Sequence, residues 1–346
     1  MEGNGFYNRS SRVQAAGLSP ALPLLEAAAR SVALPPAPQP VVIADYGSSE
    51  GRNSLAPMAA AIAALRERVG REREVSVVHT DLPGNDFTAL FEALADDPGS
   101  YLRDDPATYA SAVGRSYFAQ ILPAGSVTLG WSSWAVQWLS RTPAAIPDQV
   151  QVAFSRDATA HAAYAHQAAD DWRTFLTMRS RELARGGKLV VLTMAMDDAG
   201  DFGYGPLLES MYAALRELVD DGLVHGDELE RMAIPTVGRR REEFAAPFAA
   251  GDVDGLSLER LDVFSGDDRI FAQFESSGDA QAFGAQWAAF SRASVFPTLA
   301  TALKGGAGDP RADTFVDRLE AMLAARLAAA PVRMSIPLAQ MVIAKH

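Results

Sequence analysis

The sequence contains no cysteine, and histidine occurs only five times among its 346 residues. The absence of thiols excludes disulfide bonds, thiol catalysis and zinc sites built on cysteine. No apolar run reaches about 18 residues, so we expect no helix that spans a membrane. Residues 1–11 are polar and provide no apolar signal core, which favours a soluble protein located in the cytoplasm.

Basic residues are outnumbered by acidic ones: 31 Lys and Arg stand against 43 Asp and Glu, for a formal net charge of −12. Nucleic acids and anionic membranes attract proteins with a basic surface, so the charge argues against both as partners. A hydrophobic fraction of 48% in a chain of this length indicates a globular protein with a large core. We assign no residue to a metal site.

The most informative segment begins with the apolar run 41–44, which predicts a short buried strand. Asp45 and the turn 47–51 follow, and 53–69 then has a helical pattern. A buried strand, a turn of small residues and a helix, in that order, open a nucleotide-binding α/β fold.

The remaining patterns alternate strands with helices, which predicts an α/β fold with a mostly parallel sheet. The further predicted strands are 75–79, 127–131, 188–194 and 258–264, with 334–343 as an antiparallel edge strand, and the further helices are 20–32 and 158–183. Helical segments rich in Met, Leu, Phe and Trp fit this alternation poorly and predict a cap over the strand ends. We therefore expect a core of 1–200 and 256–346, with cap contributions from 200–255 and 278–310.

The turn Gly47-Ser48-Ser49-Glu50-Gly51 matches the G-x-S-x-G pattern of a hydrolase nucleophile. Only one strand can precede it, and the histidines offer no obvious triad partner, so we favour a cofactor-binding turn over a Ser49 nucleophile. Its glycines allow close approach of the backbone to a ligand. There is no G-x-G-x-x-G and no phosphate-binding lysine, which favours a cofactor without pyrophosphate, such as S-adenosylmethionine.

Two further groups of residues follow predicted strands. Asp81 lies where an acid can accept hydrogen bonds from both ribose hydroxyls, although a turn or N-cap role stays open. Trp134 and Trp138 are four residues apart, on one face of a predicted helix, with Gln137 beside them. Indole and amide N–H groups are neutral donors, which suit a carboxylate whose oxygen must stay nucleophilic.

Four segments together resemble the SABATH family, the salicylate, benzoate and jasmonate carboxyl methyltransferases with bacterial relatives. They are 43–53, 81–87 (Asp-Leu-Pro-Gly-Asn-Asp-Phe), 116–123 and 132–140. The segments 7–14 and 175–190 are also similar. The resemblance implies a class I methyltransferase fold, Rossmann-like with a seven-stranded sheet and an α-helical cap, that uses S-adenosylmethionine to methylate a carboxyl group.

The resemblance also implies roles for residues at the matching positions. Ser11, Asp45 and Asn53 would contact the methionine end of the cofactor or shape its loop, together with Gly47. Asp81 would hold the ribose, Leu82 would lie beside the adenine, and Ser116 and Tyr117 would cover it. Gln14 and Trp138 would grip the substrate carboxylate and so perform the catalytic positioning, with Tyr7, Trp134 and Gln137 also at the substrate.

Two departures from the family pattern concern the substrate. The aromatic residues that flank a benzoate-type ring fall at Leu208 and Val237, so both flanks are aliphatic and favour an aliphatic acid. We therefore expect methyl esters of small or medium apolar acids, fatty or aromatic, formed without a general base because carboxylic acids have a pKa near about 4–5. N- or phenol O-methylation, an idle cofactor-binding module and a serine hydrolase are the alternatives, and a homodimer is left open.

Overall fold

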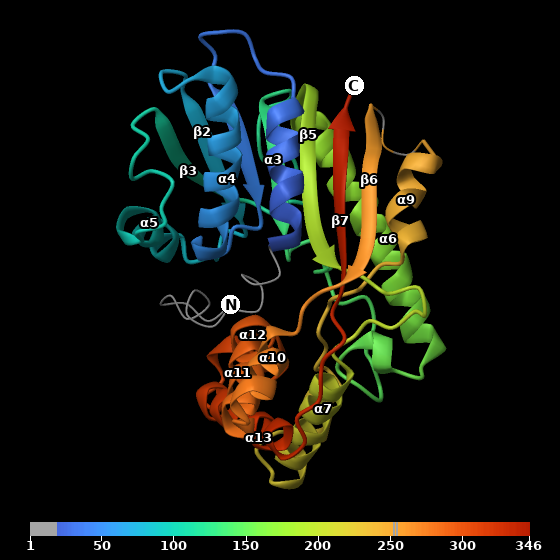
Figure 1. The fold of residues 1–346 in the computed structure, drawn as a ribbon. Coiled ribbons are helices and arrows are strands. Elements are labelled where there is room, and N and C mark those ends of the chain that lie inside the picture. The colour runs from blue at the N-terminus through green and yellow to red at the C-terminus, as the bar shows by residue number, and fades with distance from the viewer. Residues whose placement is uncertain (1–18, 252, 254) are drawn as a thin grey trace.

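The computed structural model describes residues 19–251, 253 and 255–346, and these form one seven-stranded sheet flanked by helices (Figure 1). The spatial order of the strands is β3-β2-β1-β4-β5-β7-β6. Their bounds are β1 Val41–Tyr46, β2 Val75–Asp81, β3 Thr108–Gly114, β4 Val127–Ser133, β5 Leu183–Met194, β6 Leu256–Ser265 and β7 Pro337–Lys345. The strands from β3 to β5 pair in parallel, and β7 pairs antiparallel with both β5 and β6. This topology confirms the predicted class I methyltransferase fold.

The prediction that the last strand lies at an edge is wrong. β7 lies between β5 and β6, and eight of its nine residues are buried. At this end of the sheet the edge strand is β6, whose central residues are partly or fully exposed. A strand covered on both faces needs a continuous apolar run, which residues 341–344 provide, whereas an edge strand tolerates charged side chains such as Glu259 and Arg260.

Helices cover both faces of the sheet. α3 (Leu22–Ser31) and α4 (Arg52–Val69) pack together on one face, while α6 (Ala158–Glu182) and α9 (Arg241–Ala249) cover β5 and β6 on the other (Figure 1). α4 begins after Gly51, whose φ of 86° is the left-handed conformation that favours glycine. The helix α5 (Phe87–Asp96) follows β2 and is capped by the Asp86 carboxylate, which accepts a hydrogen bond from Ala89 N.

The remaining helices gather beyond the carboxyl ends of the parallel strands and form the cap (Figure 1). They are α7 Gly205–Asp220, α8 Gly226–Leu229, α10 Arg269–Ser277, α11 Ala280–Ser294, α12 Phe296–Ala300 and α13 Ala312–Ala329. Short 3₁₀ turns occur along the described chain at η1 Ser19–Ala21, η2 Val152–Phe154 and η3 Gly306–Gly308. α13 packs against α11 and α7, and α10 packs against α11. The predicted cap limits, 200–255 and 278–310, stay a prediction.

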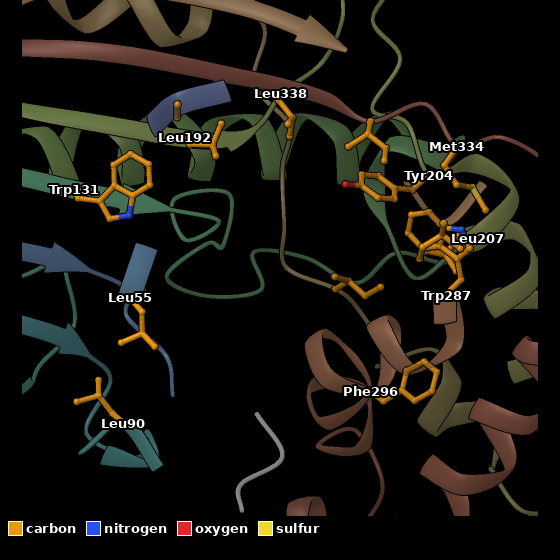
Figure 2. Close-up of a cluster of buried hydrophobic side chains, with 14 of the residues drawn as sticks. Leu55, Leu90, Trp131, Leu192, Tyr204, Leu207, Trp287, Phe296, Met334 and Leu338 are labelled. Carbon is orange, nitrogen blue, oxygen red and sulfur yellow. The ribbon is translucent and has the colours of Figure 1, made fainter. Parts of the chain in front are cut away.

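One continuous buried cluster joins the sheet to the cap. It includes Trp131 and Leu192 on the sheet, Tyr204 and Leu207 at the start of α7, and Trp287 on α11 (Figure 2). Because these side chains share one core, the cap is held against the strand ends by apolar packing. In the part of the chain that the structure describes, no helix has both the length and the apolarity needed to cross a membrane.

Candidate active site

A cavity of about 720 Å³ lies at the carboxyl ends of the parallel strands, beneath the cap. Its volume is within the range of about 300–1,000 Å³ typical of small-molecule sites. Loops after β1, β2, β3 and β4 form one part of its wall. The other part comes from α7, the end of α11 and the start of α12. Open α/β sheets bind ligands at this position, because the loops that leave neighbouring parallel strands converge there.

The turn after β1 is fixed by close packing against the loop after β4. Gly47 has φ of 90°, and a Cβ atom there would approach the Ala135 Cβ atom to 2.5 Å, so only glycine fits. The backbone N–H groups of Gly47 and Ser48 donate to the Thr80 carbonyl oxygen, over 2.8 and 3.0 Å. The turn therefore brings Gly47 and Ser49 to the cavity wall beside the end of β2, as expected for a cofactor turn.

Asp81 lines the cavity at the end of β2, and both its carboxylate oxygens are anchored by backbone N–H groups. Oδ2 accepts from Ser49 N and Oδ1 accepts from Leu82 N, each over 2.7 Å. Burial raises the pKa of Asp81, and these two hydrogen bonds oppose that rise. Each carboxylate oxygen has two lone pairs, so each can still accept one hydroxyl donor from a ribose.

Asp45 lies behind this wall. The structure buries it to 2% exposure, and it is not among the described residues that line the cavity. Its carboxylate accepts from Ser54 Oγ and pairs with His79 Nδ1 over 2.9 Å, and His79 Nε2 pairs in turn with the Tyr101 hydroxyl over 2.7 Å. Asp45 therefore supports the shape of the loop. Asn53, in the first turn of α4, also stands away from the described lining.

The predicted adenine positions lie together on the wall. Ser116 and Tyr117 line the cavity after β3, and Leu82 lines it with an unusually high exposure of 56% for a leucine. The Tyr117 hydroxyl donates to the Ala135 carbonyl oxygen over 3.0 Å, which ties this loop to the one after β4. An exposed apolar side chain at a cavity wall is available to pack against a planar base.

An ion pair at the end of α6 holds the Tyr117 loop from behind. Arg179 and Glu182 are both fully buried and lie 2.9 Å apart. The Arg179 guanidinium donates to the carbonyl oxygens of Tyr117 and Ala119, and Glu182 accepts from Leu122 N. Because every charged group here is satisfied by a partner, the pair can fix the backbone of the loop that lines the cofactor end.

The segment after β4 is not the helix that the spacing of its tryptophans predicts. Trp134 has φ of 54°, and Trp138 forms a β-bridge with Thr236. Gln137 is buried, donates to the Trp134 carbonyl oxygen over 2.7 Å and accepts from Thr193 Oγ1 over 2.9 Å. A turn closed by the Gln137 amide therefore replaces the helix, and it still brings both tryptophans and Gln137 to the cavity.

The two predicted substrate flanks have different positions. Leu208, on α7, lines the cavity. Val237 does not flank it: its side chain lies in a separate buried cluster with Leu139, Tyr164 and Ala168, and Thr236 lines the wall instead. Three predicted residues lie outside the described residues, namely Tyr7, Ser11 and Gln14.

Sequence reasoning missed several residues of the wall. Glu50, Asn85 and Asp86 lie within segments that already resemble the family, so the motifs themselves could have indicated them. The composition of the cap segments predicted an apolar cap but did not single out the residues of its wall, which are Phe202, Tyr204, Leu207, Met211, Phe290 and Val295.

The charges on the wall are of one sign. Glu50, Asp81 and Asp86 line the cavity beside the loops after β1 and β2. None of the described residues on the wall is lysine, arginine or histidine. The cofactor end is therefore acidic, which suits a ligand with positive charge, and the described wall offers a substrate neutral hydrogen-bond donors only. These features fit S-adenosylmethionine. The acids suit its sulfonium and ammonium groups, and the anchored Asp81 suits its ribose.

Comparison with known proteins identifies the family. Residues 2–341 match the family model described as SAM dependent carboxyl methyltransferase. The chain belongs to the SAM-dependent carboxyl methyltransferase family. This match confirms the predicted SABATH-type resemblance, enzyme class and cofactor, S-adenosylmethionine.

Individual relatives agree with the family match. Benzoate O-methyltransferase of Zea mays is 26% identical over 307 residues, which cover 80% of this chain and 77% of the relative. Methyltransferase FUS9 of Gibberella moniliformis is 27% identical over 241 residues, and the match covers 69% of this chain but only 64% of FUS9. The chain thus spans less than two thirds of the fungal relative's length.

Among solved structures, loganic acid methyltransferase with SAH superposes with a TM-score of 0.80, covering 100% of this chain and 98% of the other. At 20% identity, that likeness shows the fold alone.

Proposed function

We propose that this protein forms methyl esters of small or medium apolar carboxylic acids. The observation that carries the proposal is the composition of the cavity wall. Acids gather at the end formed by the loops after β1 and β2, neutral donors follow β4, and apolar side chains come from the cap, with no basic side chain among the described wall residues.

At the acidic end, the residues of the chain bind and orient the cofactor. Bound S-adenosylmethionine supplies a methyl group on a positively charged sulfur. Asp81, Glu50 and Asp86 place negative charge around that end, and Asp81 offers acceptor positions to ribose hydroxyls. Leu82 and Tyr117 provide the surfaces beside the adenine. Ser11, Asn53 and Asp45 complete this proposal at the methionine end, with Asp45 acting through the loop that it supports.

At the other end, the chain must orient a carboxylate without quenching it. A carboxylate is already ionised at neutral pH, so no protein base is required. Trp138 supplies an indole N–H, Gln137 retains a second amide N–H, and Trp134 Nε1 is buried without a partner among the described residues. Neutral donors can fix the carboxylate while leaving its oxygen nucleophilic, and alignment of this kind supplies on the order of 7–11 kcal/mol. Gln14 and Tyr7 belong to the same proposal.

The apolar wall sets the class of acid. Leu207, Leu208 and Met211 come from α7, and Phe290 comes from α11. This mixture favours an aliphatic chain, since each buried methylene contributes about 0.8 kcal/mol. An aromatic acid is the nearest alternative, supported by the name of the maize relative. N- or phenol O-methylation is less well supported, because the described wall has no histidine or lysine to remove a proton.

A methyl-transfer screen tests the proposal. Purified protein would be incubated with labelled S-adenosylmethionine and a panel of fatty, aromatic and terpenoid acids, with the matching amines and phenols in parallel. We expect methyl esters, identified by mass spectrometry, and a kcat/KM lowered about tenfold by Trp138→Phe, which keeps an aromatic ring but removes the indole N–H. Transfer to amines or phenols alone would refute the proposal.

Two further tests concern the remaining alternatives. Labelling of Ser49 by an active-serine phosphonate probe would indicate a hydrolase, whereas the protein should stay unlabelled. The cytoplasmic location and the homodimer stay predictions, which cell fractionation and light scattering test.

A further inference from the structure

Tyr204 is a buried hydroxyl donor at the cavity wall that the proposed chemistry does not use. It is the N-cap residue of α7, and it is one of the residues that line the cavity although it is only 2% exposed. Its hydroxyl has no hydrogen-bond partner among the described residues. A buried hydroxyl without a partner is costly, so its presence calls for a ligand that completes it.

The ring of Tyr204 cannot turn to find another partner. It stacks on Phe290 with centroids 6.4 Å apart and planes 5° apart, and it meets Trp287 edge-on at 6.1 Å. The Tyr204 backbone N–H also donates to the Ser335 carbonyl oxygen over 3.1 Å. Figure 2 shows the Tyr204 oxygen directed away from Leu207, Trp287 and Met334, which lie on the other side of the ring. The donor is therefore held in one place.

Two other hydroxyls on the cap side of the wall, those of Ser291 and Ser294, are already used. Ser291 Oγ donates to the Trp287 carbonyl oxygen over 3.0 Å, and Ser294 Oγ donates to the Phe290 carbonyl oxygen over 2.7 Å. Burial raises the pKa of Tyr204 above the usual value for tyrosine, so its hydroxyl stays protonated and remains a donor at neutral pH. A phenylalanine would fill the same space without the cost of an unpaired hydroxyl. The Tyr204 oxygen is therefore not explained by packing and indicates a contact with a ligand.

We infer that the acid carries a second oxygen, a carbonyl or hydroxyl placed along its apolar chain, which accepts the Tyr204 O–H. The inference rests on the proposed function. In it, Trp138 in the segment after β4 orients the substrate carboxylate, and Tyr204 on the cap donates to a second oxygen of the same substrate. It narrows the substrate class from apolar acids to oxo or hydroxy acids. A site that hydrogen-bonds a substrate group discriminates strongly against the analogue that lacks it.

Calorimetry with S-adenosylhomocysteine-saturated protein tests this inference through binding. The probes are pairs of straight-chain acids, each plain acid matched with oxo and hydroxy forms in which the oxygen moves one carbon at a time. We expect one position to bind about tenfold more tightly than the plain acid in wild type. Tyr204→Phe should abolish that preference, so that the oxo or hydroxy acid binds about as tightly as its plain partner.

Tyr164 provides a matched control. Its hydroxyl is also buried and unpartnered among the described residues, but it lines a separate cavity of about 90 Å³. Tyr164→Phe should keep the preference. Equal affinities within every wild-type pair, no binding of any member, or a preference that survives Tyr204→Phe would overturn the inference. If no acid is methylated but the binding preference disappears in Tyr204→Phe, the proposed function fails while the inference stands.

Discussion

Replacing Asp81 by asparagine should weaken cofactor binding because one of its two acceptor oxygens becomes a donor. In the wild type, each carboxylate oxygen accepts one backbone N–H, from Ser49 and from Leu82, and keeps a lone pair for a ribose hydroxyl. Asparagine retains one such oxygen and replaces the other with a donor. A hydrogen bond to a charged group contributes about 1.5–3 kcal/mol, so the affinity for S-adenosylmethionine should fall about tenfold to a hundredfold.

The pH dependence of binding gives the same prediction a second measurement. Burial raises the pKa of Asp81, and the ribose hydroxyls require its ionised form as their acceptor. Cofactor affinity should therefore be highest above that pKa and should fall as the pH is lowered through it. Asp81→Asn has no carboxyl group to titrate, so its affinity should not show this limb.

Titration calorimetry with wild type, Asp81→Asn and Asp86→Asn would separate contact from charge. Asp86 lines the same end of the cavity and caps α5, and asparagine is an equally good N-cap. The Asp86 variant thus removes the same charge without removing a ribose acceptor. Unchanged affinity in Asp81→Asn, or an equal loss in both variants, would refute the assignment of the ribose to Asp81, provided that thermal melts show both variants folded.

The other predictions concern the absence of a catalytic histidine, the apolar substrate pocket and the buried ion pair of Arg179 and Glu182. The kcat/KM should show no limb near pH 6.5 that disappears when one histidine is replaced, because no described wall residue is histidine; a limb removed by His79→Gln would contradict this. The kcat/KM should rise about fourfold per added methylene until the cap is full. Leu208→Trp should lower turnover of the longest acid and favour benzoate, whereas Val237→Ala should lower the melting temperature with chain-length preference unchanged; a preference for benzoate in wild type would contradict the aliphatic pocket. Arg179→Met should lower the free energy of unfolding in urea by about 3–5 kcal/mol, because it leaves Glu182 buried without its partner. A decrease below about 1 kcal/mol would contradict the stabilising role of this ion pair.

Local patterns predicted the nucleotide-binding half of the fold. The run 41–69 has a buried strand, a glycine turn and a helix in direct succession, and all three are observed. β3 escaped prediction because it is an edge strand in which only Thr108 is buried, and its Tyr109 is 55% exposed. Its seven residues lack the continuous apolar run of an interior strand.

The candidate site was predictable where it lies in short motifs and not where it depends on the direction of a side chain. The spacing of Trp134 and Trp138 fits a helix, but a turn closed by Gln137 also brings both to the cavity. Thr236 lines the wall and Val237 does not, and no pattern of periodicity fixes that one-residue difference in a loop. Tyr204 depends on packing between α7 and α11, which are far apart in sequence.

The path of the chain around β6 and β7 has a consequence for how such enzymes diversify. The cap helices α10–α13 lie between these two strands in sequence, yet Ser265 at the end of β6 pairs with Pro337 at the start of β7. The inserted segment thus leaves and re-enters the sheet at neighbouring points. Its length and sequence can change while the strands stay paired, so evolution or a protein engineer can exchange the part of the cap built from α10–α13 without rebuilding the loops after β1 and β2.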